Sequence, residues 1–308
     1  MDVLFVGLGS IGTRHLQNLH TVAQQKGISV RAWALRSSDR PLPEATRALL
    51  AGEMRALKEN DRFDAAFITN PTSLHFDALR LLQGKAGALF IEKPIFDRTD
   101  VALSQCILPG QKAYVAAPMR WCGVMLALKR HLPDLRPYSA RVICSSYLPD
   151  WRPGVDYRKV YSAHRDMGGG VTIDLIHEWD YLVELFGKPL EMYHFKGTYS
   201  DLEIDSDDLS VYIARYPSML AEVHLDYFGR EYRRSIELFC KERTAVADFG
   251  AGTLTLPDGT VERWDELVNQ RYLREMDYFL DYAQGGAGES VNTPAMALDV
   301  LKLTLGEI

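Results

Sequence analysis

The chain has 308 residues, of which 47% are hydrophobic and 25% are charged, a composition typical of a folded protein with room for two domains. Its net charge of −6 argues against a nucleic-acid-binding function, because phosphate recognition draws on clusters of excess Lys and Arg. No apolar run approaches the roughly 18 residues that a membrane-spanning helix needs.

Short apolar strands alternate with helical segments over the first 118 residues, which is the pattern of a parallel α/β sheet. Strands are expected at Val3–Gly7, Ile28–Leu35, Ala65–Thr69, Ala88–Ile91 and Ala113–Ala117. Helices are expected between them, for example at Ile11–Gln25 and Ser73–Gln83. We therefore expect a doubly wound N-terminal domain over residues 1–118, with the boundary in the segment between Pro118 and Leu135.

The pattern changes from Tyr138 onward, where a strand at Ala140–Tyr147 is followed by a long loop and a helix that carries Asp174 and His177. From residue 190 to residue 264, apolar and polar residues alternate in successive segments, which predicts antiparallel strands with two unlike faces. Pro257-Asp258-Gly259 predicts the tight turn between the last two strands. Helices near Arg271–Tyr282 and Pro294–Leu305 complete a predicted α+β domain over residues 119–308.

A glycine-rich turn, Gly7-Leu8-Gly9-Ser10-Ile11-Gly12, follows the first strand and opens the first helix, which is the context of a dinucleotide-binding fingerprint. Gly7 permits the tight turn, Gly9 lets a pyrophosphate approach the backbone, and Gly12 lets the helix pack closely on the strand. The helix N-terminus offers free N–H groups and a positive dipole to phosphates.

The end of the second strand bears on the choice between NAD and NADP. An acidic residue there would bind the ribose hydroxyls, but this chain has Leu35-Arg36-Ser37-Ser38 instead. A guanidinium and two hydroxyls suit a 2′-phosphate, so we favour NADP. Stacking of Arg36 on the adenine, which would leave NAD usable, is the alternative.

Two further strand ends carry residues that suit a ligand site, because open parallel sheets bind ligands beyond the carboxyl ends of their strands. Thr69-Asn70-Pro71 follows one strand and Glu92-Lys93-Pro94 follows the next. Lys93 precedes a proline, which restricts its backbone, and its ammonium group can stabilise a developing alkoxide. A surface lysine at a strand end is the alternative.

The segment Met167–Tyr181 runs from three glycines into a predicted helix on which Asp174, His177 and Tyr181 share one face. An apolar stripe on the opposite face is formed by Leu175, Ile176, Trp179, Leu182, Val183 and Phe186. A histidine beside a carboxylate and away from the core suggests acid–base chemistry, and for this segment alone a solvated helix face is an equal alternative.

Together these motifs resemble those of the Gfo/Idh/MocA family of nicotinamide-dependent oxidoreductases, and the resemblance covers nearly the whole chain. It rests on the glycine turn with His15 after it, Asn70-Pro71, Glu92-Lys93-Pro94, and the three glycines followed by Asp174 and His177. The resemblance implies an N-terminal Rossmann domain, a second domain with a large open, mostly antiparallel sheet, and activity on sugars, cyclitols or their derivatives.

The family resemblance also implies the site residues. Lys93, Asp174 and His177 correspond to its catalytic set, with His177 as acid and base, Lys93 on the substrate oxygen and Asp174 as the orienting group. The commoner family pattern places the acid four positions before the base, whereas Asp174 lies three positions before His177. Contacts to the cofactor are expected from Gly7, Gly9, Ser10, Ile11, Gly12, Arg36, Ser37, Thr69, Asn70, Pro71, His75, Glu92 and Lys93.

Substrate contacts are expected from the aromatic and basic loop Asp150–Arg165, because aromatic rings stack on sugars and arginines pair with carboxylates or phosphates. The residues assigned to the substrate are Arg120, Trp151, Tyr157, Arg165, Asp174 and His177. The loop suggests an anionic sugar, such as a sugar acid or a nucleotide-linked sugar, and an irregular surface loop is an equal alternative for any one of its residues. Arg230, Arg233 and Arg234 are equally consistent with an exposed strand end.

The remaining expectations concern partners and compartment. The four cysteines show neither metal-site spacing nor a dense disulfide pattern, and no basic leader precedes Val3, so we expect a cytoplasmic protein without a metal. The open sheet favours a homodimer or homotetramer. Two other functions stay open: a hydrolase or lyase of the same fold that oxidises its substrate only transiently, and a catalytically silent cofactor sensor.

Overall fold

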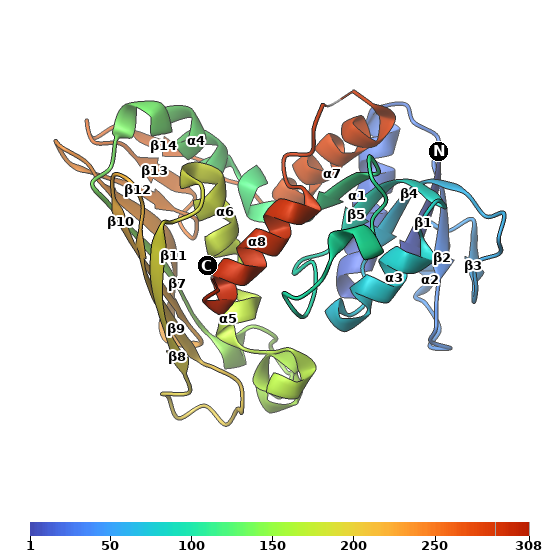
Figure 1. The fold of residues 1–308 in the computed structure, drawn as a ribbon, viewed down its shortest axis with the longest axis horizontal. Coiled ribbons are helices and arrows are strands. Elements are labelled where there is room, and N and C mark those ends of the chain that lie inside the picture. Colours follow the sequence, from blue (N-terminus) through green and yellow to red (C-terminus); the bar gives the residue numbers. More distant parts are fainter. Residues whose placement is uncertain (287, 308) are drawn as a thin grey trace. The chain divides into compact units, whose positions relative to one another are not determined.

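The computed structural model describes residues 1–286 and 288–307, which form two compact units (Figure 1). The first unit comprises Met1–Pro118 and Val268–Asp299, and the second comprises Met119–Leu267 and the residues from Val300 onward. The chain first passes from one unit to the other after Pro118, which lies at the start of the predicted boundary segment. Residues 268–299, however, belong with the N-terminal unit and not with the second domain to which we had assigned them.

The first unit is built on a six-stranded sheet in the order β3-β2-β1-β4-β5-β6, and all its strand pairs are parallel. This order, with the switch between β1 and β4, is that of a dinucleotide-binding Rossmann sheet. The strands are β1 (Asp2–Val6), β2 (Arg31–Leu35), β3 (Gly52–Met54), β4 (Phe63–Ile68), β5 (Ala86–Ile91) and β6 (Lys112–Val115). The predicted strands are therefore confirmed, and the short edge strand β3 is an addition.

The helices of the first unit include α1 (Ser10–Gln25), α2 (Glu44–Arg47), α3 (His75–Leu81) and α7 (Asn269–Gln284). Helix α1 begins directly after the glycine turn and packs against α7. Their shared core contains a stack of Phe5, Phe67 and Phe90 from three adjacent strands, with centroid separations of 4.6 and 4.9 Å. Phe279 of α7 meets Phe67 and Phe90 edge to face at 5.2 and 5.1 Å.

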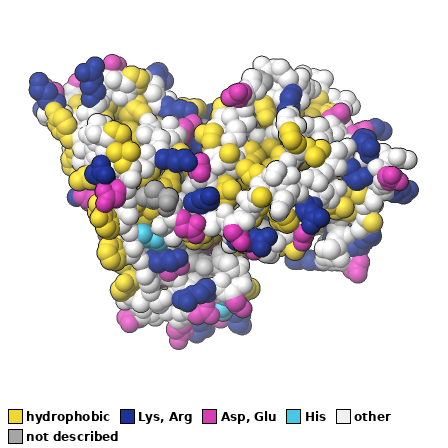
Figure 2. Space-filling view, viewed as in Figure 1, with side chains coloured by type: hydrophobic (Ala, Val, Ile, Leu, Met, Phe, Trp, Pro, Cys, Tyr) yellow, Lys and Arg dark blue, Asp and Glu magenta, His cyan; other side chains and the backbone are white. Residues whose placement is uncertain are grey.

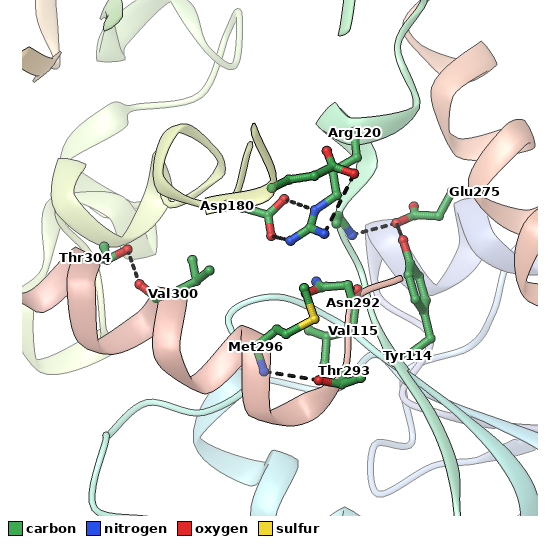
Figure 3. A network of polar contacts seen from close by, with 12 residues as sticks. Tyr114, Val115, Arg120, Asp180, Glu275, Asn292, Thr293, Met296, Val300 and Thr304 are labelled. Atoms are coloured by element: carbon green, nitrogen blue, oxygen red, sulfur yellow. Dashed lines mark hydrogen bonds and ion pairs between the residues drawn. The ribbon is translucent and has the colours of Figure 1, made fainter. Parts of the chain in front are cut away.

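The position of Phe279 explains why α7 belongs to the first unit. The ring is completely buried among aromatic residues of the Rossmann sheet, and burial of such a side chain contributes about 2–3 kcal/mol of hydrophobic free energy. Tyr114 of β6 also donates a hydrogen bond to the buried carboxylate of Glu275 in α7, at 2.7 Å (Figure 3). The sequence of α7 shows where its apolar face lies but not which sheet it covers.

The second unit is built on an eight-stranded sheet in the order β14-β13-β12-β11-β7-β10-β9-β8. Only one pair, β7 and β10, is parallel, so the predicted large and mostly antiparallel sheet is confirmed. Its strands are β7 (Ser139–Tyr147), β8 (Glu191–Gly197), β9 (Leu209–Arg215), β10 (Leu220–Asp226), β11 (Phe228–Phe239), β12 (Thr244–Asp248), β13 (Thr253–Thr255) and β14 (Val261–Arg263).

Three helices of the second unit lie over one face of this sheet: α4 (Gly123–Leu135), α5 (Val171–Asp174) and α6 (His177–Phe186) (Figure 1). The last helix of the chain, α8, spans Pro294–Leu305, as the sequence predicted. Within the described residues, no helix is long and apolar enough to cross a membrane. No group of three or more His, Cys, Asp or Glu side chains in the same part of the chain has the arrangement of a metal site.

One expectation about the second unit is wrong in detail. The segment after the three glycines is not a single helix, because Leu175 leaves helical geometry (φ −97°, ψ +31°) and separates α5 from α6. Asp174 ends the first helix and His177 begins the second, so regular helical spacing does not relate them. Tyr181, which the single helix would place beside them, is completely buried, with its ring 5.5 Å from that of Phe249.

Candidate active site

The glycine turn of the first unit has the geometry that a dinucleotide requires. Gly7 has a left-handed φ of +90°, and a Cβ at Gly12 would lie 2.7 Å from both the Gly7 carbonyl oxygen and Thr69 Oγ1. A Cβ at Gly9 would instead meet no atom within 4 Å. The turn therefore packs tightly on its inner side and leaves the backbone at Gly9, the residue before α1, open to a phosphate.

The two predicted loops at the next strand ends are tied to this turn and to each other. Thr69 donates a hydrogen bond to the carbonyl oxygen of Gly7 at 2.6 Å. The ring nitrogens of buried His75 lie 3.1 Å from the backbone oxygens of Asn70 and Ile95. Burial lowers the pKa of His75 despite these carbonyl contacts. The structure thus places His75 between the two loops, where it fixes their backbones.

Glu92 and Lys93 follow β5 at the carboxyl edge of the sheet. The Glu92 carboxylate lies 2.5 Å from Nε2 of completely buried His15, and it also accepts the backbone N–H of Lys93 at 3.0 Å. Burial by itself raises the pKa of Glu92, but the hydrogen bond from His15 and the charges of His15 and Lys93 outweigh it and lower that pKa. An ionised Glu92 therefore holds the turn that carries Lys93.

Arg36 lies at the end of β2, where the sequence predicts the discrimination between NAD and NADP. Its Nη1 donates to the carboxylate of Glu53 in β3 at 2.5 Å, and its side chain is only 10% exposed. The guanidinium also contacts the carbonyl oxygen of Arg40. Sequence reasoning missed Glu53, because β3 is too short to give a strand pattern.

In the second unit, Asp174 is held by two tyrosines. Tyr161 donates a hydrogen bond to its Oδ1 at 2.7 Å, and buried Tyr227 donates to its Oδ2 at 2.5 Å. Burial, and then the charge of Asp174, raise the pKa of Tyr161 and of Tyr227, so both phenols stay protonated as donors at neutral pH. Each carboxylate oxygen of Asp174 therefore has a fixed donor.

Asp174 and His177 line one cavity of about 470 Å³ in the second unit. Both residues therefore reach the same cavity in spite of the break between α5 and α6. They do so without sharing one helical face, which is how the sequence predicts that they come together. The other lining residues are Cys144, Ser146, Tyr147, Asp150, Trp151, Leu175, Gly229, Arg230, Tyr232 and Arg234. A cavity of this size, with aromatic walls and a few polar groups, is typical of small-molecule sites.

The expected substrate residues of the loop lie in different places. Trp151 lines the cavity and donates its indole N–H to Ser146 at 3.0 Å. Tyr157 and Arg165 are not among the residues that line it. The Tyr157 hydroxyl accepts the backbone N–H of Glu203, and the backbone N–H of Arg165 donates to Asp205. Their proposed contacts to a substrate stay predictions.

Arg120, the remaining expected substrate residue, is buried and only 2% exposed. Its guanidinium makes two hydrogen bonds to Asp180 of α6, at 2.7 and 2.8 Å (Figure 3). Glu184, one helical turn further along α6, lies 3.9 Å away. In the structure this arginine anchors the helix that begins with His177, and no local sequence pattern indicates its pairing with Asp180.

The strand order and the glycine turn of the first unit are those of a dinucleotide-binding Rossmann architecture. Residues 1–106 match the model of the oxidoreductase family with an NAD-binding Rossmann fold, Gfo/Idh/MocA. Over these residues the chain is similar to this family, and the resemblance drawn from the motifs is confirmed.

Solved structures extend the similarity to the whole chain. UDP-N-acetylglucosamine 3-dehydrogenase GnnA from Acidithiobacillus ferrooxidans matches at 19% identity and a TM-score of 0.76, with 99% of this chain and 96% of that chain covered. The WlbA dehydrogenase from Bordetella pertussis, in complex with NADH and UDP-GlcNAcA, matches at 17% identity and 0.77, covering 99% and 94%. A levoglucosan dehydrogenase in complex with NADH matches at 15% and 0.81, covering 99% and 95%.

At these identities the structural matches establish a shared two-domain fold. A search of curated proteins gives no match.

The ionised state of Glu92 predicts a dependence of stability on pH. Because the folded-state pKa of Glu92 is lowered, its contribution is complete above the unfolded pKa, about 4.3, and is lost as the pH falls through the folded value. We expect Glu92→Gln to lower the unfolding free energy by about 2 kcal/mol near pH 6 and by less toward pH 3.5. Urea denaturation at several pH values measures this difference.

The matched control for this measurement is Glu59→Gln, which alters an exposed carboxylate and should leave the unfolding free energy unchanged. A Glu92→Gln deficit that stays constant down to pH 3.5 would contradict the assignment of an ionised Glu92.

Proposed function

We propose that this protein is a dehydrogenase or reductase that transfers a hydride between a nicotinamide cofactor and a hydroxyl-bearing carbon of a sugar-type substrate. The observation that carries the proposal is the cavity in which His177 lies with an Asp174 fixed by two tyrosine donors. It occurs in a chain whose first unit has the open glycine turn of a dinucleotide site. An acid–base histidine and a dinucleotide site are the minimum that oxidation of an alcohol requires.

The roles in this proposal follow from the chemistry of each group. The nicotinamide, when bound, accepts or donates the hydride. His177 takes the proton of the substrate hydroxyl during oxidation and returns it during reduction. Lys93 donates a hydrogen bond to the same oxygen and stabilises its negative charge. Asp174 cannot turn freely, because both of its oxygens accept a tyrosine hydroxyl, so it presents a fixed acceptor to His177 or to a neighbouring hydroxyl.

The substrate class is the finer part of the proposal. The solved structures with the same fold include enzymes named for a nucleotide-linked amino sugar and for an anhydrosugar. The cavity offers Trp151 and Tyr232 as aromatic surfaces together with hydrogen-bonding groups, which suits a ring with several hydroxyls. We therefore propose a sugar, a sugar acid or a nucleotide-linked sugar.

Substitution of the two proton-handling groups tests the mechanism. We expect Lys93→Ala and His177→Ala each to lower kcat by about 10²–10⁴-fold, because each removes a group that acts on the substrate oxygen. The assay screens sugars, sugar acids and nucleotide sugars with NADP and with NAD, and follows reduced nicotinamide. The control Lys196→Ala alters an exposed lysine of the second unit and should keep full activity.

Normal hydride transfer by both folded variants would refute these roles. Product formation without net cofactor reduction would instead favour the hydrolase or lyase that oxidises its substrate transiently. Cofactor binding without turnover of any substrate would favour the cofactor sensor.

We further propose that NADP is preferred to NAD, with Arg36 and Ser37 at the 2′-phosphate. The support is an arginine, and no acidic residue, directly after β2. Its guanidinium is already paired with Glu53, so a 2′-phosphate would have to share or displace that carboxylate. The preference therefore depends on both side chains.

Two substitutions separate these contributions. We expect Arg36→Ala to raise the KM for NADP by about 10-fold or more and to change the KM for NAD little, because a charge-assisted contact to phosphate is lost. Glu53→Gln should increase the preference for NADP by releasing the guanidinium. Steady-state kinetics with both cofactors measure the ratio, and Arg62→Ala, an exposed arginine before β4, is the control. Equal changes for NAD and NADP would contradict the proposal.

We also propose a homodimer or homotetramer formed through the open sheet, in the cytoplasm. Hydrophobic side chains lie along the side of the sheet that faces away from α4 and α6 (Figure 2), and Tyr193, Phe195 and Ile213 are 59, 68 and 41% exposed. The four cysteines are free, which agrees with a reducing compartment.

Light scattering at assay concentration tests the assembly. We expect a mass of two or four chains, and substitution of Phe195 by Glu should reduce it by placing a charge in the proposed interface. A wild-type monomer would contradict the proposal.

A further inference from the structure

Strand β11 is interrupted by a bulge next to the cavity. Phe228 pairs with Tyr147 of β7, and Arg233 pairs with Ser145, so four residues of β11 stand opposite a single residue of β7. Bulges of this kind bend a strand and redirect its side chains, and they are frequent beside active sites. The side chains between Phe228 and Arg233 therefore leave the regular alternation of the sheet.

The bulge is fixed by specific contacts. Oδ1 of buried Asp226 accepts the backbone N–H groups of Phe228 and Gly229, at 3.1 and 2.7 Å. A Cβ at Gly229 would lie 1.8 Å from Ser145 Oγ and 3.1 Å from Ser145 Cβ, so a larger residue here would have to displace the Ser145 side chain. Asp226 and Gly229 therefore specify the backbone conformation of the bulge, which is not a loose strand end.

The consequence of the bulge is the position of Arg230. Its guanidinium carbon lies 3.7 Å from the centre of the Tyr147 ring, and both residues line the cavity that contains His177. Among the described residues, no carboxylate lies within ion-pair distance of Arg230. Stacking occupies the face of the guanidinium and leaves its N–H edge available.

The other charges of the cavity wall differ in this respect. Arg234 is paired with completely buried Glu178, and its Nε donates at 2.7 Å. Asp174 has two tyrosine donors, whereas Asp150 is exposed to solvent. Arg230 is thus the arginine of the described cavity wall whose charge is not already neutralised by a carboxylate.

We propose that Arg230, oriented by Tyr147, is the specificity-determining residue for an oxyanion carried by the substrate, a carboxylate or a phosphate monoester. This inference rests on the proposed function, and it narrows the substrate from sugars in general to anionic sugars. The planar N–H edge of a stacked arginine matches two oxygens of such a group. The cavity of about 470 Å³ accommodates one sugar ring with its substituent.

The test uses matched neutral and anionic probes. The first set is glucose and galactose with glucuronate and galacturonate, and the second replaces the acids by the 6-phosphates of the two sugars. Binding to the full-length protein with cofactor is measured by isothermal titration calorimetry, and turnover by reduced nicotinamide. The two anionic sets distinguish a carboxylate from a phosphate as the recognised group.

We expect at least one anionic probe to bind more tightly than its neutral partner, and Arg230→Gln to weaken that binding about 10- to 100-fold. Binding of the neutral partner should change less than about twofold. The control Arg233→Gln removes an arginine of the same bulge that lines a groove with Arg141 and His224 instead, and it should have no effect. Tyr147→Leu should weaken anion binding, whereas Tyr147→Phe, which keeps the ring, should preserve it.

A panel in which no anionic probe binds more tightly than its neutral partner would overturn the inference. An equal effect of Arg230→Gln on neutral and anionic probes would do the same. Anion binding that is unchanged in Arg230→Gln, with hydride transfer to sugars retained, would leave the proposed function intact and refute the role of Arg230. Arg230-dependent binding of anions without hydride transfer to any probe would support the role of Arg230 and refute the proposed function.

Discussion

The hydrogen bonds from Tyr161 and Tyr227 to Asp174 tie three parts of the second unit together. Tyr161 belongs to the loop after β7, Asp174 ends α5, and Tyr227 connects β10 to β11. A buried carboxylate that lost these donors would remain desolvated without compensation, so loop, helix and sheet must come together for it to be stable. The cavity wall around His177 depends on that joint arrangement, because Asp174 and Trp151 line it from two of these parts.

Much of the architecture could be predicted from sequence because the relevant signals are local. The alternation of strands and helices, the glycine turn before Ser10 and the turn at Pro257-Asp258-Gly259 each depend on a few neighbouring residues. The cavity residues Asp174 and His177 could also be predicted from their neighbours in sequence, although one continuous helix does not bring them together. Leu175 breaks the helix, and its sequence gives no sign of this because leucine is a good helix former.

What could not be predicted depends on contacts between residues far apart in the chain. Tyr227 lies 53 positions after Asp174, and Glu53 lies 17 positions after Arg36 in a strand of three residues. The burial of Arg120 against Asp180 likewise requires the packing of α6, which turns an apparent ligand arginine into a support for that helix. Pairings of this kind follow from tertiary packing, and no periodicity in the sequence encodes them.

The return of residues 268–299 to the first unit has a consequence for how the protein is made. The Rossmann sheet is complete in sequence after residue 118, but Phe279, which covers Phe67 and Phe90, is synthesised only near the end of the chain. During synthesis the face of the Rossmann sheet that α7 covers therefore stays exposed until the whole second sheet has been made. We therefore expect the first unit to be completed only after the second sheet has been synthesised, and we expect the nascent chain to depend most on chaperones during this interval.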